Sequence, residues 1–193
     1  MLLTPVMASF MRRWAEVQLD LDFTDRLVDV VEEGFDAVIR TGHPSESRLM
    51  SRNVGRFRLK IVASPAYLAQ YGAPEAPDDL VHHQCLLQRS PSAGKLRSWP
   101  LARSKNQEKI ILPERMSATA VDPLIALAAE GLGIACLPPF AIRAEISEGR
   151  LVSILEEFVA ETDQFSVLRP ASRQITPRPR AFIDFMAEHL QPQ

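Results

Sequence analysis

The chain has 193 residues, of which 46% are hydrophobic and 24% are charged, and its formal net charge is −2. This composition is ordinary for a globular protein of one or two small domains, whereas a domain that grips DNA by itself usually carries a strong basic excess. No apolar run approaches the roughly 18 residues that a membrane helix needs, and two cysteines are too few for a disulfide framework.

The N-terminal region does not have the order of a secretory signal. Its apolar stretch is followed, rather than preceded, by Arg12 and Arg13, and no small-residue cleavage site is evident. Together with the low cysteine count, which fits a reducing compartment, this favours a cytoplasmic protein without a membrane association.

Two helices and two strands are predicted in the first forty-two residues. Thr4 followed by Pro5 is typical of a helix start, and residues 17–23 alternate apolar and polar side chains as a strand does. Residues 25–34 predict a short helix closed by a glycine, and residues 35–42 a second strand. A parallel β-α-β unit with a right-handed crossover is the expected arrangement.

Downstream of a polar loop, helices and strands continue to alternate, which is typical of an α/β fold. Prolines in the first turn and glycines at the end mark the helices, and apolar runs mark the strands. The wholly apolar run near residue 135 predicts a buried strand of a parallel sheet. The expected strands are 57–64, 84–90, 97–101, 133–138 and 165–170, and the expected helices are 65–72, 122–131 and 175–190.

The glycine pair Gly131 and Gly133, in "AEGLGIACLPPF", could mark a phosphate-binding loop. A dinucleotide loop runs strand, glycines, helix, and needs a third glycine three residues after the second. Here the order is helix, glycines, strand, and Cys136 stands at the third position. We therefore interpret Gly131 as a helix end and Gly133 as a tight strand entry, and we expect no nucleotide cofactor.

Four collinear segments resemble the effector-binding domain of LysR-type transcriptional regulators and cover nearly the whole chain. They are "LDLDFTDRLVDVVEEGFDAVIRTG", "LKIVASPAYLAQYGAPEAPDDLVHHQCL", "AAEGLGIACLPPF" and "PRPRAFIDFMAEHL". The resemblance implies a fold like type II periplasmic solute-binding proteins: two Rossmann-like α/β subdomains joined by two crossover strands, with a small effector in the cleft. Subdomain I would comprise residues 1–63 and 164–193, with the final helix returning to it, and subdomain II residues 64–163.

Two parts of such a regulator are not found in this sequence. The family's winged helix-turn-helix domain is absent, and so is the strand with which the effector domain normally opens. We therefore expect a regulator truncated inside its sensing domain, which would reach DNA only through the missing part. The resemblance also implies a side-by-side homodimer, with helix 3–14 and strand 17–23 against the partner's second subdomain, and an open sheet margin favours such pairing.

Candidate effector contacts lie at the carboxyl ends of the predicted strands, where ligands bind in open α/β sheets. Arg40 is suited to a carboxylate because its guanidinium offers paired donors, so the effector is expected to be anionic or aromatic. A solvated loop arginine is the alternative for Arg40, and a helix cap is the alternative for Thr24. The resemblance assigns these positions to the effector: Thr24, Arg40, Thr41, Gly42, Ser64, Gln88, Arg89, Ser90, Thr119, Ala120, Pro138 and Phe140.

The motif "HHQC" at residues 82–85 offers three potential metal ligands, two histidines and a cysteine, but adjacent residues rarely converge on one ion and no fourth ligand is near. We expect no metal, and no nucleophile–base set that would indicate an enzyme stands out. The predicted function is a non-enzymatic, effector-sensing and dimerisation module that regulates transcription when joined to a DNA-binding domain. A transporter's solute-binding protein with the same fold is the alternative.

Overall fold

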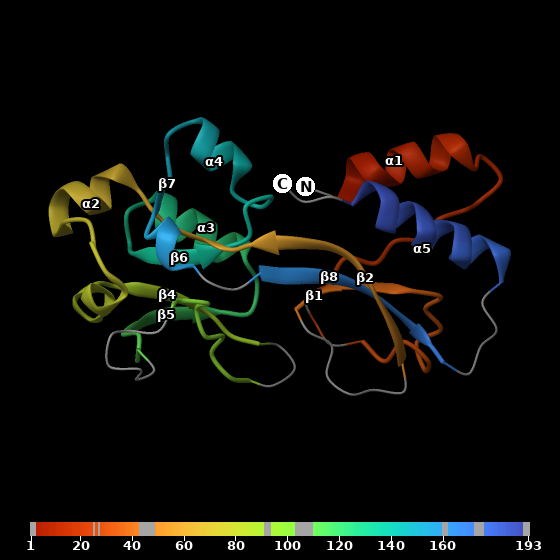
Figure 1. Cartoon of the computed structure of the whole chain (residues 1–193), viewed down its shortest axis with the longest axis horizontal. Coiled ribbons are helices and arrows are strands. Elements are labelled where there is room, and N and C mark those ends of the chain that lie inside the picture. Colours follow the sequence, from red (N-terminus) through yellow and green to blue (C-terminus); the bar gives the residue numbers. More distant parts are fainter. Residues whose placement is uncertain are drawn as a thin grey trace. The chain divides into compact units, whose positions relative to one another are not determined.

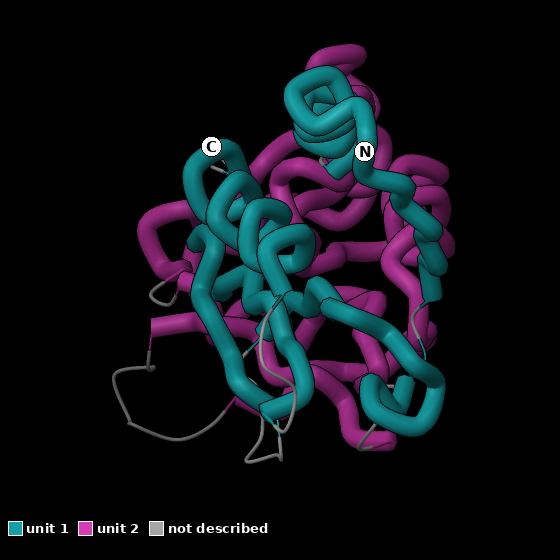
Figure 2. The backbone as a smooth tube through the Cα atoms, turned by 90° about the vertical axis from the view of Figure 1, so that its right-hand side faces the viewer, with its two compact units in different colours: residues 1–57, 163–193 teal, residues 58–162 magenta. Residues whose placement is uncertain are grey.

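A computed structural model gives the fold of the chain and describes residues 3–24, 26, 28–42, 49–90, 94–102, 110–159, 162–171 and 176–190. The chain divides into two compact units (Figure 2). Unit 1 comprises residues 1–57 and 163–193, and unit 2 comprises residues 58–162. The predicted mixed α/β fold with two subdomains is confirmed.

Unit 1 contains a three-stranded sheet in the order β1-β8-β2. Its strands are β1 (Val38–Thr41), β2 (Leu49–Arg58) and β8 (Thr162–Pro170). β1 pairs antiparallel with β8, so that Val38 lies opposite Leu168 and Arg40 lies opposite Ser166. The N-terminal and C-terminal parts of the chain therefore share one sheet.

Two helices, α1 (Leu3–Arg13) and α5 (Pro177–His189), contact each other in unit 1 (Figure 1). Phe10 of α1 packs edge-to-face on Phe182 of α5, with ring centroids 5.2 Å apart, and also contacts the rings of Trp14 and Phe185. Aromatic pairs of this geometry stabilise a core beyond the area they bury. The helices predicted at the two ends of the chain are confirmed.

The predicted strand at residues 17–23 is wrong. These residues form neither helix nor strand, and Leu21 and Phe23 are exposed at 44% and 55%. A strand needs hydrogen-bonded neighbours, and none of the described residues pairs with this segment. Alternation of apolar and polar residues alone was therefore not sufficient to predict a strand here.

The predicted helix at residues 25–34 is also wrong within its described part, which forms turns. The Asp29 carboxylate accepts hydrogen bonds from the N–H groups of Val31 and Glu32 at 2.9 and 3.0 Å. Side-chain bonds of this kind compete with helical backbone bonds. Without this helix and the strand before it, the expected parallel β-α-β unit does not form, and β1 finds its partner far along the chain in β8.

Unit 2 contains a five-stranded sheet in the order β5-β4-β6-β3-β7. β4 runs parallel to both β5 and β6, whereas β3 runs antiparallel to β6 and β7. The predicted strand at 133–138 is confirmed as β6, although only its β4 side is parallel. The strands are β3 (Lys60–Ala63), β4 (Cys85–Gln88), β5 (Glu114–Ala118), β6 (Ile134–Leu137) and β7 (Val152–Ile154).

Two further strand predictions need correction. Residues 97–101 form no strand, and Leu101 makes only an isolated bridge to Val159. The segment preceding residue 57, predicted as a polar loop, contains β2 from Leu49 onward, and Leu59 separates β2 from β3. Asparagine and glycine, which β2 contains as Asn53 and Gly55, are rare in strands, and this explains why the sequence pattern did not indicate β2.

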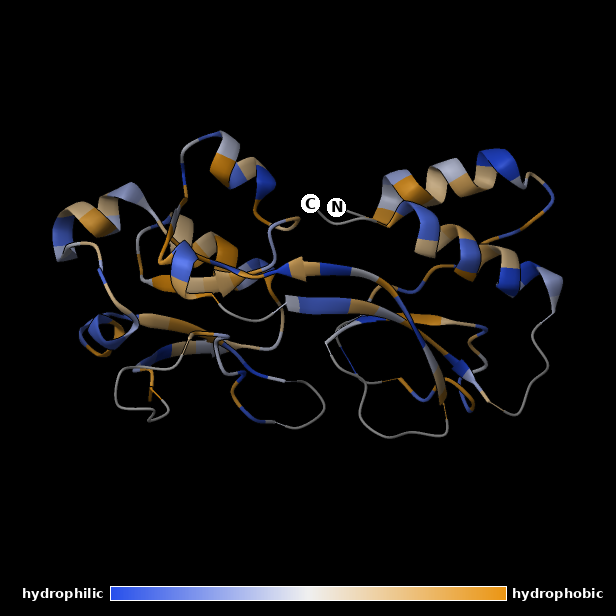
Figure 3. Cartoon of the chain, viewed as in Figure 1, coloured by the Kyte–Doolittle hydropathy of each residue, from blue (hydrophilic) through white to orange (hydrophobic). Residues whose placement is uncertain are grey.

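Both faces of the unit 2 sheet are covered by apolar side chains. Val62 of β3 packs in a cluster with Leu124 and Ala128 of α3, whereas the neighbouring Ile61 packs with Tyr67. Figure 3 shows that α3 and β6 are largely hydrophobic. The helical segments are α2 (Pro65–Tyr71), η1 (Pro77–His82), α3 (Asp122–Ala129), α4 (Arg143–Ser147) and η2 (Glu156–Phe158).

The glycine pair has the structural roles predicted for it. Gly131 follows α3 with φ +79°, its N–H donates to the Ala128 carbonyl, and the Leu132 N–H donates to the Leu127 carbonyl. These are the two bonds of a Schellman helix end. At Gly133, an added Cβ would lie 2.5 Å from the Gln84 carbonyl oxygen, so the close approach of the two backbones requires glycine.

Unit 2 begins at Arg58 and ends at Thr162, whereas the resemblance implied a second subdomain of residues 64–163. Residues 58–63 belong to unit 2, because β3 is paired on both sides by β6 and β7 of that unit. Within the part of the chain that the structure describes, no helix is both long enough and apolar enough to cross a bilayer.

Candidate functional site

Strand β1 ends with Arg40 and Thr41 and is followed by Gly42, and all three were predicted to contact the effector. Gly42 has φ +94°, a backbone conformation that residues other than glycine rarely adopt. Its N–H donates to the Gln164 carbonyl at 3.0 Å. Arg40 lies opposite Ser166, which is 1% exposed. Directly opposed residues point to the same face of a sheet, so Arg40 shares its face with Ser166, and the exposed Thr41 points to the other.

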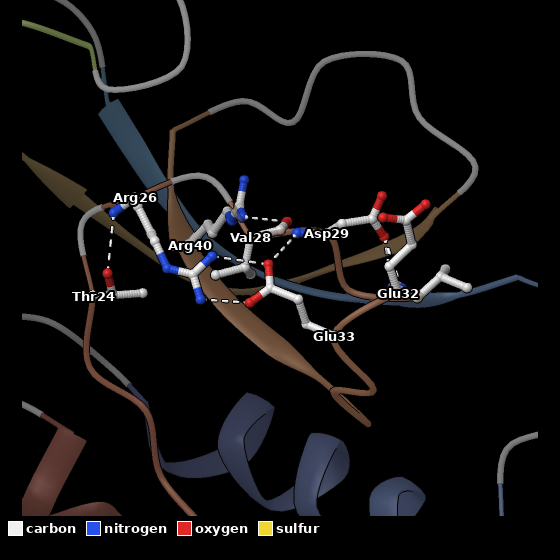
Figure 4. A network of polar contacts seen from close by, with 8 residues as sticks. Thr24, Arg26, Val28, Asp29, Glu32, Glu33 and Arg40 are labelled. Carbon is white, nitrogen blue, oxygen red and sulfur yellow. Dashed lines mark hydrogen bonds and ion pairs between the residues drawn. The ribbon is translucent and has the colours of Figure 1, made fainter.

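The Arg40 guanidinium is partly buried and has one described hydrogen bond, from Nη2 to the Val28 carbonyl at 3.1 Å (Figure 4). Burial lowers the pKa of this guanidinium. No carboxylate among the described residues is paired with it. A cation partly removed from water without a counter-ion is costly, and a bound anion would offset that cost.

A second arginine close in sequence, Arg26, differs because it already has a carboxylate partner. Its two Nη atoms donate to the two carboxylate oxygens of Glu33, one of them at 2.8 Å. These bonds hold the pKa of Glu33 below its usual range. Arg26 is therefore neutralised by Glu33, whereas no carboxylate of the described residues neutralises Arg40.

Thr24 does not cap a helix, since the described residues after it form turns rather than a helix. Its hydroxyl accepts a hydrogen bond from the Arg26 N–H at 3.3 Å, and the side chain is exposed. The helix-cap interpretation is thus wrong, and an effector contact by Thr24 stays a prediction.

In unit 2, the structure brings most of the remaining predicted residues to one edge of the sheet. β4, β5 and β6 run in the same direction, so their carboxyl ends lie along the same edge. The Arg89 N–H donates to the Ala118 carbonyl at 2.8 Å and joins two of these ends. The residues at this carboxyl edge are Gln88, Arg89, Ser90, Thr119, Ala120, Pro138 and Phe140.

The polar groups of the carboxyl edge differ in whether they already hydrogen-bond to other described residues. The Arg89 guanidinium donates to Glu114, Ser117 and the Gly94 carbonyl at 2.9–3.0 Å. Its charge is therefore balanced within unit 2. Thr119 is exposed, and its hydroxyl makes no hydrogen bond to the described residues, so it is available to a ligand.

Ser64 has a structural role in unit 2. It is buried, and its hydroxyl accepts the Tyr67 N–H at 3.1 Å as the N-cap of α2. A Cβ at Gly131 would lie 3.3 Å from this hydroxyl oxygen, which shows how closely the helix end packs on the cap. An effector contact by Ser64 would have to share a hydroxyl that already stabilises a helix.

The "HHQC" motif also lies in a structural environment. Tyr67 Oη accepts the Gln84 N–H at 2.9 Å and is hydrogen-bonded to His83 Nδ1 at 3.2 Å, in a direction set by the histidine tautomer. Burial raises the pKa of the Cys85 thiol to about 12. In the ranges that the structure describes, no three His, Cys, Asp or Glu side chains are grouped to hold a metal ion.

Several polar residues around Arg40 were not predicted from the sequence. Gln164 Nε2 donates to the Ser166 hydroxyl at 3.2 Å, and Asn53 Nδ2 of β2 donates to Gln164 Oε1. Gln164 and Ser166 stand at alternate positions of β8, and this alternation could have indicated that they lie on one face of the strand. The Arg26–Glu33 pair had no such signal, because it depends on a turn where a helix was expected.

Comparisons with known proteins agree on one family. The LysR substrate binding domain matches residues 1–191. The HTH-type transcriptional regulator CrgA of Neisseria meningitidis is 31% identical over 190 residues, which are 98% of this chain and 62% of that protein. The uncharacterized HTH-type transcriptional regulator YcaN of Escherichia coli is 31% identical over 185 residues, 95% of this chain and 60% of that protein.

Among solved structures, the regulatory domain of Neisseria meningitidis CrgA is similar with a TM-score of 0.84 at 29% identity, covering 98% of this chain and 92% of that one. The chain thus corresponds to nearly all of a regulatory domain and spans about three-fifths of the length of the curated relatives it matches.

Proposed function

The chain belongs to the LysR substrate-binding domain family, and we propose that it senses a small molecule on behalf of a transcriptional regulator. Its relatives are named as HTH-type transcriptional regulators, which favours this role over a transporter's solute-binding protein. We assign it no catalytic activity and a cytoplasmic location for the same reason. DNA would be bound by a helix-turn-helix part of the regulator, and the effector would act by binding two conformations with different affinity.

The effector class follows from Arg40. This guanidinium is partly buried, is held by one backbone carbonyl, and faces no paired carboxylate among the described residues. A planar guanidinium in that state is suited to a carboxylate, which accepts two parallel N–H bonds. We therefore propose an effector that carries a carboxylate. Thr41 and Gly42 at the same strand end are the further candidate contacts of unit 1.

The carboxyl edge of unit 2 is the second candidate ligand surface. Pro138 and Phe140 are partly exposed and offer apolar contact, and the Thr119 hydroxyl is available as a donor or acceptor. Arg89 contributes less, because Glu114 already neutralises it. This mixture favours an aromatic or aliphatic body on the ligand, with one or two polar groups.

A thermal-shift screen with matched pairs of carboxylates and amides tests the proposed effector class. Carboxylates such as benzoate should raise the melting temperature of the wild-type protein, and their amides should not. Arg40→Ala should abolish the difference, whereas Arg56→Ala, an exposed arginine of β2, should retain it. A panel in which carboxylates and amides behave alike would contradict a carboxylate effector.

We also propose that the chain forms a homodimer through α1 and the segment 17–23. The support lies in that segment, where alternating apolar residues have no strand partner among the described residues and Phe23 is 55% exposed. A second copy would provide a cover for these side chains.

A further inference from the structure

The orientation of Arg40 depends on one backbone carbonyl, that of Val28. Val28 and Val30 are buried and anchor the turn of residues 28–34 to unit 1. Arg40 Nη2 donates to the Val28 carbonyl at 3.1 Å. Any change that releases this turn would therefore release the guanidinium as well.

The turn itself is held by Glu33, as Figure 4 shows. Glu33 Oε1 accepts the Asp29 N–H at 2.9 Å and Arg26 Nη1 at 2.8 Å, and Oε2 accepts Arg26 Nη2. The Glu33 N–H donates to the Asp29 carbonyl at 2.9 Å. One carboxylate thus ties together the two ends of the turn and the chain segment before it.

Glu33 is suited to this role because it is held ionised. Its bonds to Arg26 hold the pKa of the carboxyl below its usual range, and bidentate arginine–carboxylate pairs have a defined geometry. Gly34, with φ +77°, directly follows and lets the chain leave the turn toward β1. The neighbouring Glu32 uses only its backbone N–H in the turn.

We propose that Glu33 is a positioning residue for effector binding: together with Arg26 it fixes the turn whose Val28 carbonyl aims the Arg40 guanidinium. The inference rests on the proposed carboxylate contact of Arg40. Glu33 touches no ligand in this account and acts through Arg40. Its loss should weaken carboxylate ligands selectively, because a released guanidinium must be ordered again on binding.

The first test needs no ligand. In NMR spectra of the wild-type chain, the bond to Val28 should slow rotation of the Arg40 guanidinium and give resolved Nη signals. Glu33→Ala and Arg26→Ala should each merge these signals, and the control Glu32→Ala should leave them resolved. Two variants on opposite sides of the same ion pair keep the test decisive if one of them does not fold.

The second test titrates benzoate and follows the Arg40 Nε–H signal. Glu33→Ala should weaken benzoate binding about five- to tenfold, and this effect should vanish in an Arg40→Ala background, since residues that act together are not additive. Unchanged Arg40 signals and an unchanged Kd, or a weakening that persists without Arg40, would overturn the proposal. If benzoate fails to shift Arg40 in the wild type, the carboxylate effector is contradicted, and the rotation measurement alone decides the role of Glu33.

Discussion

Phe10 and Phe182 meet with their rings 5.2 Å apart and nearly perpendicular, at 89°. Phe10 belongs to the helix that opens the described chain and Phe182 to the helix that ends it, so unit 1 is completed only when both ends of the chain are present. Unit 2 is formed by the intervening residues 58–162.

Replacing Phe10 with alanine should destabilise the chain by about 3–5 kcal/mol, the range for a fully buried phenylalanine. Phe10 is 0% exposed and contacts the rings of Trp14, Phe182 and Phe185. Urea unfolding of both proteins measures the difference. Met11→Ala on the exposed side of the same helix should change stability by roughly 0.5 kcal/mol or less, and equal effects of the two variants would contradict the packing.

Acidification should destabilise unit 2 through His83. Burial lowers the pKa of this histidine, Asp79 opposes that shift and His82 adds to it. The unfolded chain therefore takes up the proton at a higher pH than the folded chain. The contribution of His83 to the free energy of unfolding is fully present above the ordinary histidine pKa of about 6.5. It falls as the pH drops toward the pKa of the folded state, by at most about 1.4 kcal/mol per pH unit for one proton.

The variant His83→Gln should remove this part of the pH dependence, because an amide oxygen can accept the Tyr67 hydroxyl proton but does not titrate in this range. Chemical unfolding between pH 5 and about pH 7.5 measures it, across the titration range of histidine. The control His82→Gln, at an exposed position, should remove only the small contribution of His82 and leave most of this pH dependence. A wild-type curve that stays flat over this range would show that His83 is not protonated on unfolding.

Phe23→Ser should convert a dimer of the chain to monomers, because it removes an exposed aromatic side chain from the segment proposed as the interface. Light scattering coupled to gel filtration should give twice the mass of one chain for the wild type. Val31→Ser, which changes another exposed apolar residue of unit 1, should leave the mass unchanged. A monomeric wild type, or a dimer that tolerates Phe23→Ser, would be evidence against this interface.

Arg89→Ala should affect carboxylate binding far less than Arg40→Ala. The Arg89 charge is shared with Glu114, and its removal at an exposed ion pair should cost about 1 kcal/mol of stability or less. Calorimetric titration with benzoate measures the binding, with Arg115→Ala on β5 as the control. A loss of binding with Arg89→Ala as large as that with Arg40→Ala would show that Glu114 does not neutralise Arg89 in the bound state.

The elements that the sequence predicted well carry their signals locally. Pro65 and Ser64 mark the start of α2, and Gly131 marks the end of α3, so short segments were sufficient to place these helices. The apolar run that became β6 is buried except at Cys136, which is partly buried, and its composition already indicated burial.

The segments that were predicted wrongly depend on strand partners far away in the sequence or on hydrogen bonds made by side chains. Residues 17–23 have the alternation of a strand but no ladder partner in the described chain, and β1 pairs with β8 across most of the sequence. In the turn after residue 27, the Asp29 side chain takes backbone N–H groups that a helix would use. The predicted role of Arg40 could therefore be stated from the sequence, whereas its Val28 and Glu33 supports could not.

The central claim is that Arg40 is the cation that receives the effector's carboxylate. Calorimetric titration of the best carboxylate from the thermal-shift screen into wild-type, Arg40→Ala and Arg56→Ala proteins tests it most directly. Arg40→Ala should weaken binding by about 1.5–3 kcal/mol, the contribution of a charge-assisted bond, and Arg56→Ala should match the wild type. A Kd that is the same in all three proteins would contradict the account.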